Sequence, residues 1–209
     1  MNKALYIVIS GNIGAGKTTL CKGLARFFGY RPFFEPARSN PFLKDYYEDM
    51  KRWALYSQTF FAVEFARVHR EIAEVEGAVC QDRSLFECYV FADSLRRLGV
   101  LPEREYSLLR SLIDQLIYAM ERRRPDVVVY LYAPLSVLLT RVQERGDKRE
   151  QAVTLEYLQH LQEAYEGWIA QVTDIPVVAV DSDHIDFRYR EGITAVLKMI
   201  FSHLEREEV

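Results

Sequence analysis

Short apolar runs alternate with longer amphipathic stretches along this chain. The runs are rich in β-branched residues and predict strands at residues 4–9, 31–34, 78–81, 126–132 and 175–180. Apolar positions at helical spacing predict helices at residues 19–28, 40–76, 102–123, 134–145, 155–172 and 187–204. Strands that alternate with helices favour a central parallel five-stranded sheet flanked by helices, which is the α/β class.

The composition fits one globular domain. The chain has 209 residues, of which 49% are hydrophobic, and it shows no internal repeat and no linker rich in Gly, Ser or Pro. We therefore expect a single domain over residues 1–209. The formal net charge of −3 leaves no global basic field, which argues against binding to a nucleic-acid polymer or to an anionic membrane.

Cysteine usage and the N-terminal run favour a reducing compartment. Cys21, Cys80 and Cys88 are odd in number and follow no metal-ligand spacing, so we expect reduced thiols, no disulfide and no zinc. The first apolar run is too short for a secretion signal or a membrane span. A cytoplasmic protein is the expectation.

The strongest motif lies between the first predicted strand and the first predicted helix. Residues 11–18 read Gly-Asn-Ile-Gly-Ala-Gly-Lys-Thr and match G-x-x-x-x-G-K-[ST]; we call them the phosphate loop. The glycines let backbone N–H groups turn toward phosphate, Lys17 reaches the β and γ phosphates, and Thr18 is placed to bind Mg²⁺. The expected ligand is a nucleoside triphosphate, and a turn that binds nothing is the alternative.

A carboxylate follows the second predicted strand. Glu35 and Pro36 come directly after residues 31–34, and the carboxyl ends of parallel strands face the ligand crevice. Glu35 is suited there to accept the proton of a substrate hydroxyl while that oxygen attacks the γ phosphate. A surface turn explains a Glu-Pro pair equally well.

Asp82, Arg83 and Ser84 end the third predicted strand at the same edge. Asp82 is suited to hold Mg²⁺ through its water shell, and Arg83 to neutralise charge on the moving phosphoryl group or to steer Glu35. Ser84 is better explained as the cap of the next helix. A structural salt bridge is the alternative role for Asp82 and Arg83.

Two further features suggest parts of a nucleotide site. Gln58 lies in an aromatic helix, where its amide could bind a nucleobase edge between Phe61 and Phe91; an exposed glutamine is the alternative. Residues 141–151 are dense in charge and broken by Gly146, which is typical of a lid whose arginines close over a triphosphate. A solvated connector between helices is the alternative.

Taken together, these motifs resemble the deoxynucleoside kinase family. The resemblance rests on the phosphate loop with Thr19, Glu35-Pro36, residues 53–59, Asp82-Arg83-Ser84, the lid arginines, residues 155–158 and Trp168. Residues 40–43, 47–53 and 183–187 look most similar to the bacterial deoxyadenosine and deoxyguanosine kinases. The resemblance implies a P-loop kinase fold and an ATP- and Mg²⁺-dependent phosphotransferase of nucleotide salvage that forms a homodimer.

The family pattern assigns a role to each matching residue on the acceptor side. Glu35 is the base for the 5′-hydroxyl, and Arg83 contacts the 5′ region. Tyr47 and Glu150 hold the sugar 3′-hydroxyl, and Gln58 binds the base. The resemblance therefore implies that a ribose 2′-hydroxyl is disfavoured, and the bacterial branch that the chain resembles implies a purine deoxynucleoside as the substrate.

On the donor side, the resemblance gives Lys17 a catalytic role beside Glu35 and Arg83. Thr18 and Asp82 serve the magnesium ion. Arg141 lies near the donor adenine, and Asp186 and Phe187 flank that adenine. The expected ATP-binding residues are Gly11, Asn12, Ile13, Gly14, Ala15, Gly16, Lys17, Thr18, Thr19, Arg141, Arg145, Asp186 and Phe187.

This chain departs from the family pattern at two places. The segment after Ser84 is one residue shorter, which leaves Glu87 or Cys88 where the family often has an acidic residue that reads the base. Asp147 occupies a lid position where the family often has arginine, so Lys148 or Arg149 is expected to replace that charge.

Two other functions fit parts of the sequence. A nucleoside monophosphate kinase of the thymidylate kinase type also joins a phosphate loop to an Asp-Arg pair, but it calls for an added cation near Glu35, and residues 33–37 contain none. A switch GTPase or a non-catalytic scaffold is the other alternative. The chain lacks the guanine-reading N-K-x-D motif, and a scaffold has no need of an intact catalytic set.

Overall fold

A computed structural model describes residues 4–119, 123–147 and 153–207. Their strands are β1 (Tyr6–Gly11), β2 (Arg31–Phe33), β3 (Val79–Asp82), β4 (Val127–Tyr132) and β5 (Val177–Asp181). They form one sheet in the order β2-β3-β1-β4-β5, and every neighbouring pair is parallel. The predicted parallel five-stranded sheet is confirmed, and each strand lies where an apolar run predicted it.

Most helices follow the predicted amphipathic stretches, but the longest stretch is divided in two and α4 lies outside every predicted range. They are α1 (Lys17–Phe28), α2 (Leu43–Glu48), α3 (Met50–Ala73), α4 (Cys88–Arg97), α5 (Glu103–Tyr118), α6 (Leu135–Arg145), α7 (Leu155–Ile169) and α8 (Arg190–Glu207), with short 3-10 helices η1 (Pro36–Ser39) and η2 (Leu85–Glu87). Asp49 separates α2 from α3 because its carboxylate accepts a hydrogen bond from the Arg52 N–H and caps the new helix.

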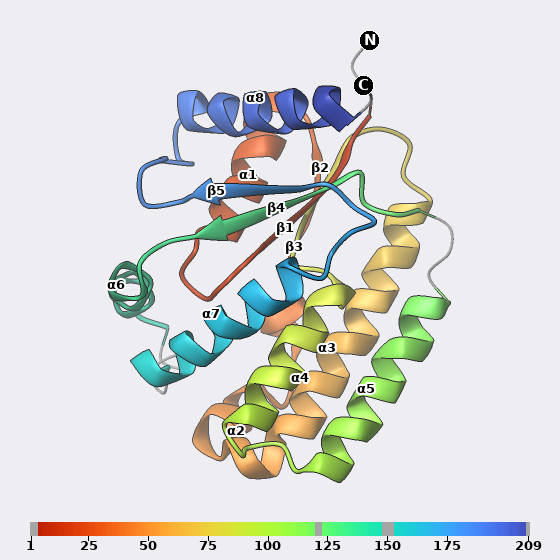
Figure 1. The fold of residues 1–209 in the computed structure, drawn as a ribbon, viewed down its shortest axis with the longest axis vertical. Helices are drawn as coiled ribbons and strands as arrows, with labels where there is room; N and C mark the ends of the chain where they lie inside the picture. The colour runs from red at the N-terminus through yellow and green to blue at the C-terminus, as the bar shows by residue number, and fades with distance from the viewer. Residues whose placement is uncertain (1–3, 120–122, 148–152, 208–209) are drawn as a thin grey trace.

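The elements form three layers. Helices α1 and α8 cover one face of the sheet, while α3, α4, α5 and α7 gather on the other (Figure 1). All six residues of β1 are buried because this central strand has helices over both of its faces. Within the described ranges, no helix is long and apolar enough to cross a membrane.

The order of the strands determines where a ligand can bind. The chain passes from β1 through α1 to β2, and β3 then returns to lie between β2 and β1, while β4 and β5 extend the sheet on the other side. Ligands of such sheets bind at the carboxyl ends of the strands, where the winding changes direction. The phosphate loop after β1, Glu35 after β2 and Asp82 at the end of β3 all lie at that edge.

All three cysteines are buried free thiols. The Sγ atoms of Cys21 on α1 and Cys80 on β3 are 3.3 Å apart inside the core. In the described part of the chain, no group of three His, Cys, Asp or Glu side chains is arranged to hold a metal ion.

Candidate active site

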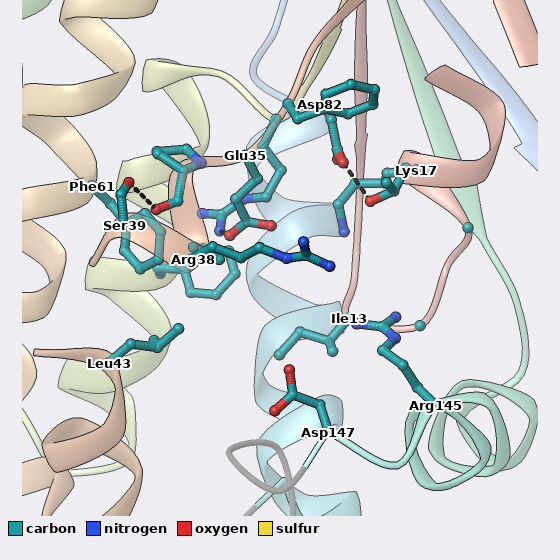
Figure 2. A pocket seen from close by; sticks show the side chains of 18 of the residues that line it. Ile13, Lys17, Glu35, Arg38, Ser39, Leu43, Phe61, Asp82, Arg145 and Asp147 are labelled. Atoms are coloured by element: carbon teal, nitrogen blue, oxygen red, sulfur yellow. Dashed lines mark hydrogen bonds and ion pairs between the residues drawn. The ribbon is translucent and has the colours of Figure 1, made fainter. Parts of the chain in front are cut away.

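A cavity of about 680 Å³ opens at the carboxyl edge of the sheet. The phosphate loop and the end of α6 form one side, η1, α2 and α3 form the other, and Asp82 and α7 lie between them (Figure 2). The predicted residues that line the cavity are Ile13, Gly14, Gly16, Lys17, Thr18, Thr19, Glu35, Tyr47, Gln58, Asp82, Arg83 and Arg145.

The glycines of the phosphate loop are required by backbone geometry. Gly11, Gly14 and Gly16 all have positive φ angles, which side chains rarely tolerate. A Cβ on Gly14 would also lie 2.7 Å from the backbone oxygen of Leu138 in α6. The loop can therefore curl tightly between β1 and α1, with the N-terminus of α1 directed at the site.

Lys17 lies folded against the phosphate loop. Its Nζ donates hydrogen bonds to the backbone oxygens of Gly11 and Asn12, both at 2.9 Å. Burial lowers the pKa of Lys17, and the nearby carboxylates of Asp82 and Glu35 oppose that effect. The ammonium group is thus a buried cation held by neutral carbonyls, and a phosphate would be a stronger partner.

Thr18 and Asp82 bring oxygen atoms together across the edge of the sheet. Thr18 Oγ1 donates to Asp82 Oδ2 at 2.5 Å, while Asp82 Oδ1 is buried with no hydrogen-bond partner among the described residues. Burial raises the pKa of Asp82, and the charge of Lys17 opposes the rise. A hydroxyl and a carboxylate with an unused oxygen fit Mg²⁺, which binds through one or two protein oxygens and the phosphates of its nucleotide.

Glu35 and Arg83 form an ion pair at the centre of the site. Arg83 Nη1 donates to Glu35 Oε1 at 2.5 Å, and the guanidinium lies 3.9 Å from the ring centroid of Phe91. Although burial disfavours its charged form, Glu35 and the neighbouring Glu87 hold the pKa of Arg83 above its ordinary value. The backbone of Arg83 has φ +63, a strained conformation of the kind found at functional sites.

Glu87 lies behind Arg83 and outside the lining of the cavity. Its carboxylate is fully buried and accepts hydrogen bonds from Ser10 Oγ at 2.9 Å, Ser84 N at 3.0 Å and Tyr165 Oη at 2.7 Å. Arg83 Nε is 3.9 Å away. With its oxygens held in this way, Glu87 is placed to support Arg83 rather than to contact a base as predicted.

The far end of the cavity combines an amide with aromatic rings. Gln58 is buried, and its Oε1 has no hydrogen-bond partner within the described ranges. Phe61 and Phe91 line the cavity beside it, as does Tyr47. A buried acceptor without a partner is costly, so this end is prepared for a ligand that offers a hydrogen-bond donor.

The residues predicted to surround the donor adenine gather beside the phosphate loop. Arg141 donates to the hydroxyl and the backbone oxygen of Ser182, at 3.2 and 2.9 Å. The Phe187 ring approaches Gly16 so closely that a Cβ there would lie 3.3 Å from it. Asp186 accepts from Arg188, which lowers the pKa of Asp186 to about 2. This group lies outside the main cavity, next to the loop.

Part of the predicted lid can be placed. Arg141 and Arg145 lie on α6, which ends at Gly146 with φ +65, and Asp147 follows in the cavity lining. Glu150, Lys148 and Arg149 lie outside the described residues. Gly11, Asn12 and Ala15 belong to the phosphate loop without lining the cavity.

Several residues that the sequence analysis did not place in the site also line the cavity, among them two tyrosines and an arginine. Tyr46 on α2 and Tyr157 on α7 meet with their hydroxyl oxygens 3.1 Å apart, and burial raises the pKa of both. Arg38 comes from η1. Residues 33–37 contain no cation, but the turn that follows Glu35 brings Arg38 into the cavity, so a lack of positive charge near Glu35 no longer argues against a phosphorylated acceptor. A basic residue three positions after Glu35 was the signal available in the sequence.

The chain is similar to known proteins in both sequence and fold. The sequence model of the family described as Deoxynucleoside kinase matches residues 7–201. A Deoxyadenosine/deoxycytidine kinase of Bacillus subtilis is 30% identical over 185 residues, covering 88% of this chain and 85% of the relative. A Deoxyadenosine kinase of Dictyostelium discoideum is 35% identical over 184 residues, covering 87% and 74%.

A solved structure shares the fold over its whole length. The deoxyadenosine kinase from M. mycoides with bound dCTP superposes with a TM-score of 0.83 at 25% identity, covering 95% of this chain and 100% of that one. The sequence match, the shared fold and the phosphate loop opposite the Glu35–Arg83 pair lead to one conclusion: the chain belongs to the deoxynucleoside kinase family.

Proposed function

We propose that this kinase moves the γ-phosphoryl group of ATP to the 5′-hydroxyl of a deoxynucleoside, with a purine as the preferred base, in nucleotide salvage. The observation that carries the proposal is that the Glu35–Arg83 pair and Lys17 line one cavity from opposite sides. A carboxylate therefore faces the phosphate-binding side at the point where an acceptor hydroxyl must lie. Residues 1–209 act in this proposal as one kinase domain.

The reaction follows from these positions. Glu35 accepts the proton of the 5′-hydroxyl while its oxygen bonds to the γ phosphorus, and the bond to the β–γ bridging oxygen breaks. Arg83 holds Glu35 in place and adds positive charge beside the reacting atoms. Lys17 and the loop N–H groups bind the phosphates of ADP as negative charge accumulates there.

Magnesium completes the donor side in this proposal. Thr18 and Asp82 would hold the ion, directly or through water. The ion would supply positive charge that offsets the negative charge of the phosphates. Removal of Mg²⁺ with EDTA is expected to abolish turnover, and restoration of Mg²⁺ to recover it.

The acceptor end distinguishes sugars and bases. Tyr47, with Glu150 in the part of the chain that the structure does not describe, would bind the sugar 3′-hydroxyl. Gln58 would bind the base between Phe61 and Phe91, because its unpartnered Oε1 requires a donor such as the exocyclic amino group of adenine. The purine preference draws support from relatives named deoxyadenosine and deoxyguanosine kinases.

One assay tests the substrate class. The purified chain is incubated with ATP, Mg²⁺ and each of deoxyadenosine, deoxyguanosine, deoxycytidine, thymidine and their 5′-monophosphates, and ADP release is followed. The expected result is fastest turnover with a deoxypurine nucleoside. Turnover restricted to a monophosphate would support the thymidylate kinase type, and ATP binding without turnover would support a scaffold.

The dimer is a separate part of the proposal. Helices α3 and α5 pack together, and both expose large apolar side chains, Val63 on α3 and Leu108 and Tyr118 on α5. Covering such side chains with a second copy would remove them from water. Sedimentation should give a mass near twice that of one chain, and Leu108→Glu should lower it. A cytoplasmic location stays a prediction.

A further inference from the structure

Arg38 reaches the active-site cavity by a local turn. Pro36–Ser39 form η1 directly after Glu35, and Ser39 Oγ donates to the Pro36 oxygen at 2.9 Å. In a 3-10 helix, side chains three positions apart lie above one another, so Arg38 returns to the same wall as Glu35. Figure 2 shows the Arg38 side chain running into the cavity toward Lys17, while Ser39 turns back to the start of η1.

Arg38 differs from Arg83 in how its charge is balanced. Arg83 is buried and paired with Glu35. Arg38 is exposed to the cavity, and no hydrogen bond or ion pair joins it to any residue in the described ranges. An unpaired guanidinium offers five N–H donors, whose planar arrangement matches a phosphate group.

The charges around Arg38 favour an anion at one place. Lys17 and Arg145 line the same cavity from the side of the phosphate loop, across from Arg38 (Figure 2). Asp147, also in the lining, adds a negative charge beside Arg145. Arg38 supplies a cation from the acceptor side, between the carboxylate of Glu35 and the loop that holds the donor phosphates.

We infer that Arg38 is a further catalytic residue, which donates hydrogen bonds to the phosphoryl group during its transfer and then to the 5′-phosphate of the product. This inference rests on the proposed function, because it places the transfer between Glu35 and Lys17. Arg38 itself forms no covalent bond in this step. Arg38 neutralises charge on the peripheral oxygens of the phosphoryl group while the proton of the hydroxyl passes to Glu35.

Two measurements on Arg38→Gln test this role. The kcat is expected to fall about 100-fold, as for the loss of one donor to developing charge, with little change in the KM of the deoxynucleoside. Calorimetry should show about tenfold weaker binding of the deoxynucleoside 5′-monophosphate but unchanged binding of the deoxynucleoside itself. Arg38→Lys keeps the positive charge but lacks the planar guanidinium, so its kcat and monophosphate affinity should lie between those of the wild type and those of Arg38→Gln.

Arg52→Gln is the matched control, since Arg52 is an exposed arginine on α3 outside the cavity lining. Its kcat and affinities should equal those of the wild type. Unchanged kcat together with unchanged monophosphate affinity in Arg38→Gln would overturn the inference. Equal losses of deoxynucleoside and monophosphate affinity would also overturn it, because they would assign Arg38 to the placement of the nucleoside.

The calorimetric measurement of monophosphate binding tests this inference separately from the proposed function. If the wild-type chain phosphorylates none of the deoxynucleosides, the proposed function fails. The monophosphate affinities of wild type and Arg38→Gln then still decide whether Arg38 contacts a phosphate. If the wild type turns over and the two affinities are equal, Arg38 loses its role while the kinase assignment stands.

Discussion

The phosphate loop and the acceptor wall form opposite sides of one cavity but are built in different ways. The loop is eight consecutive residues whose shape depends on glycine backbone, with φ angles that other residues avoid. The wall assembles Glu35, Arg38, Gln58 and Arg83 from separate elements, and each acts through its side chain. The proposed binding of the donor phosphates therefore depends largely on one local stretch of chain, whereas the proposed recognition of the acceptor depends on how distant segments pack.

The largest effect should come from removing the carboxylate of the wall. Glu35→Gln keeps the shape of the side chain but cannot accept the proton, so kcat should fall about 10²- to 10⁴-fold. ADP affinity should stay within about twofold of the wild type, because the phosphate loop is untouched. Steady-state kinetics and calorimetry give both values.

The exposed Glu48→Gln on α2 is the control for this substitution and should keep wild-type kcat. Near-normal turnover in Glu35→Gln would remove Glu35 as the base. The same result would mean that the acceptor wall, like the phosphate loop, contributes binding but no proton transfer.

The loop should respond to a backbone change instead. Gly14→Ala places a Cβ 2.7 Å from the Leu138 oxygen at a positive φ, so we expect a loss of about 2–4 kcal/mol in the free energy of unfolding and weaker ATP binding. Gly29→Ala has a similar φ but nothing within 4 Å of the new Cβ, and should cost about 1 kcal/mol. Urea unfolding of both variants separates the cost of the contact with Leu138 from the cost of the positive φ. Equal losses of unfolding free energy in the two variants would show that α6 does not restrain the phosphate loop.

Substitution of Gln58 tests whether a residue of the acceptor wall lowers the stability of the free protein while it improves binding of the deoxynucleoside. Gln58→Leu should raise the KM of the deoxynucleoside about tenfold. It should also stabilise the free protein by about 1 kcal/mol, because it removes a buried acceptor without a described partner. Gln159→Leu on the exposed face of α7 serves as the control for kinetics and unfolding. A destabilised Gln58→Leu variant with unchanged KM would assign Gln58 to the core.

The smallest effect concerns the pH dependence of stability. Burial raises the pKa of Glu87, against the charge of Arg83, so the folded chain keeps this proton to a higher pH than the unfolded chain. The stabilising contribution is complete below the unfolded pKa of about 4.3 and is lost as pH rises through the folded pKa. Glu87→Gln should remove this decline, which is at most about 1.4 kcal/mol per pH unit for one group.

Urea unfolding between pH 4 and pH 8 measures that slope, with the exposed Glu163→Gln as control. An identical slope in Glu87→Gln and the wild type would mean that Glu87 titrates as it does in the unfolded chain. Its carboxylate would then contribute to the acceptor wall through geometry alone.

Local patterns determined most of the elements and the phosphate loop. β-Branched runs and amphipathic spacing predicted all five strands, because a strand covered on both faces must be apolar along its length. The phosphate loop was recognisable for a similar reason: its function lies in consecutive backbone groups whose conformation the glycines alone allow. Both signals lie within one short stretch of sequence.

Only the tertiary structure decided which side chains share the cavity. Glu87 follows the Asp-Arg-Ser motif closely, yet Ser10 and Tyr165 from β1 and α7 hold it behind Arg83. Arg38 stands three positions after Glu35, and it enters the cavity because a 3-10 turn follows Glu35. The position of Glu87 depends on contacts between residues far apart in the sequence, and that of Arg38 depends on the conformation of one turn; no sequence motif specifies either of them.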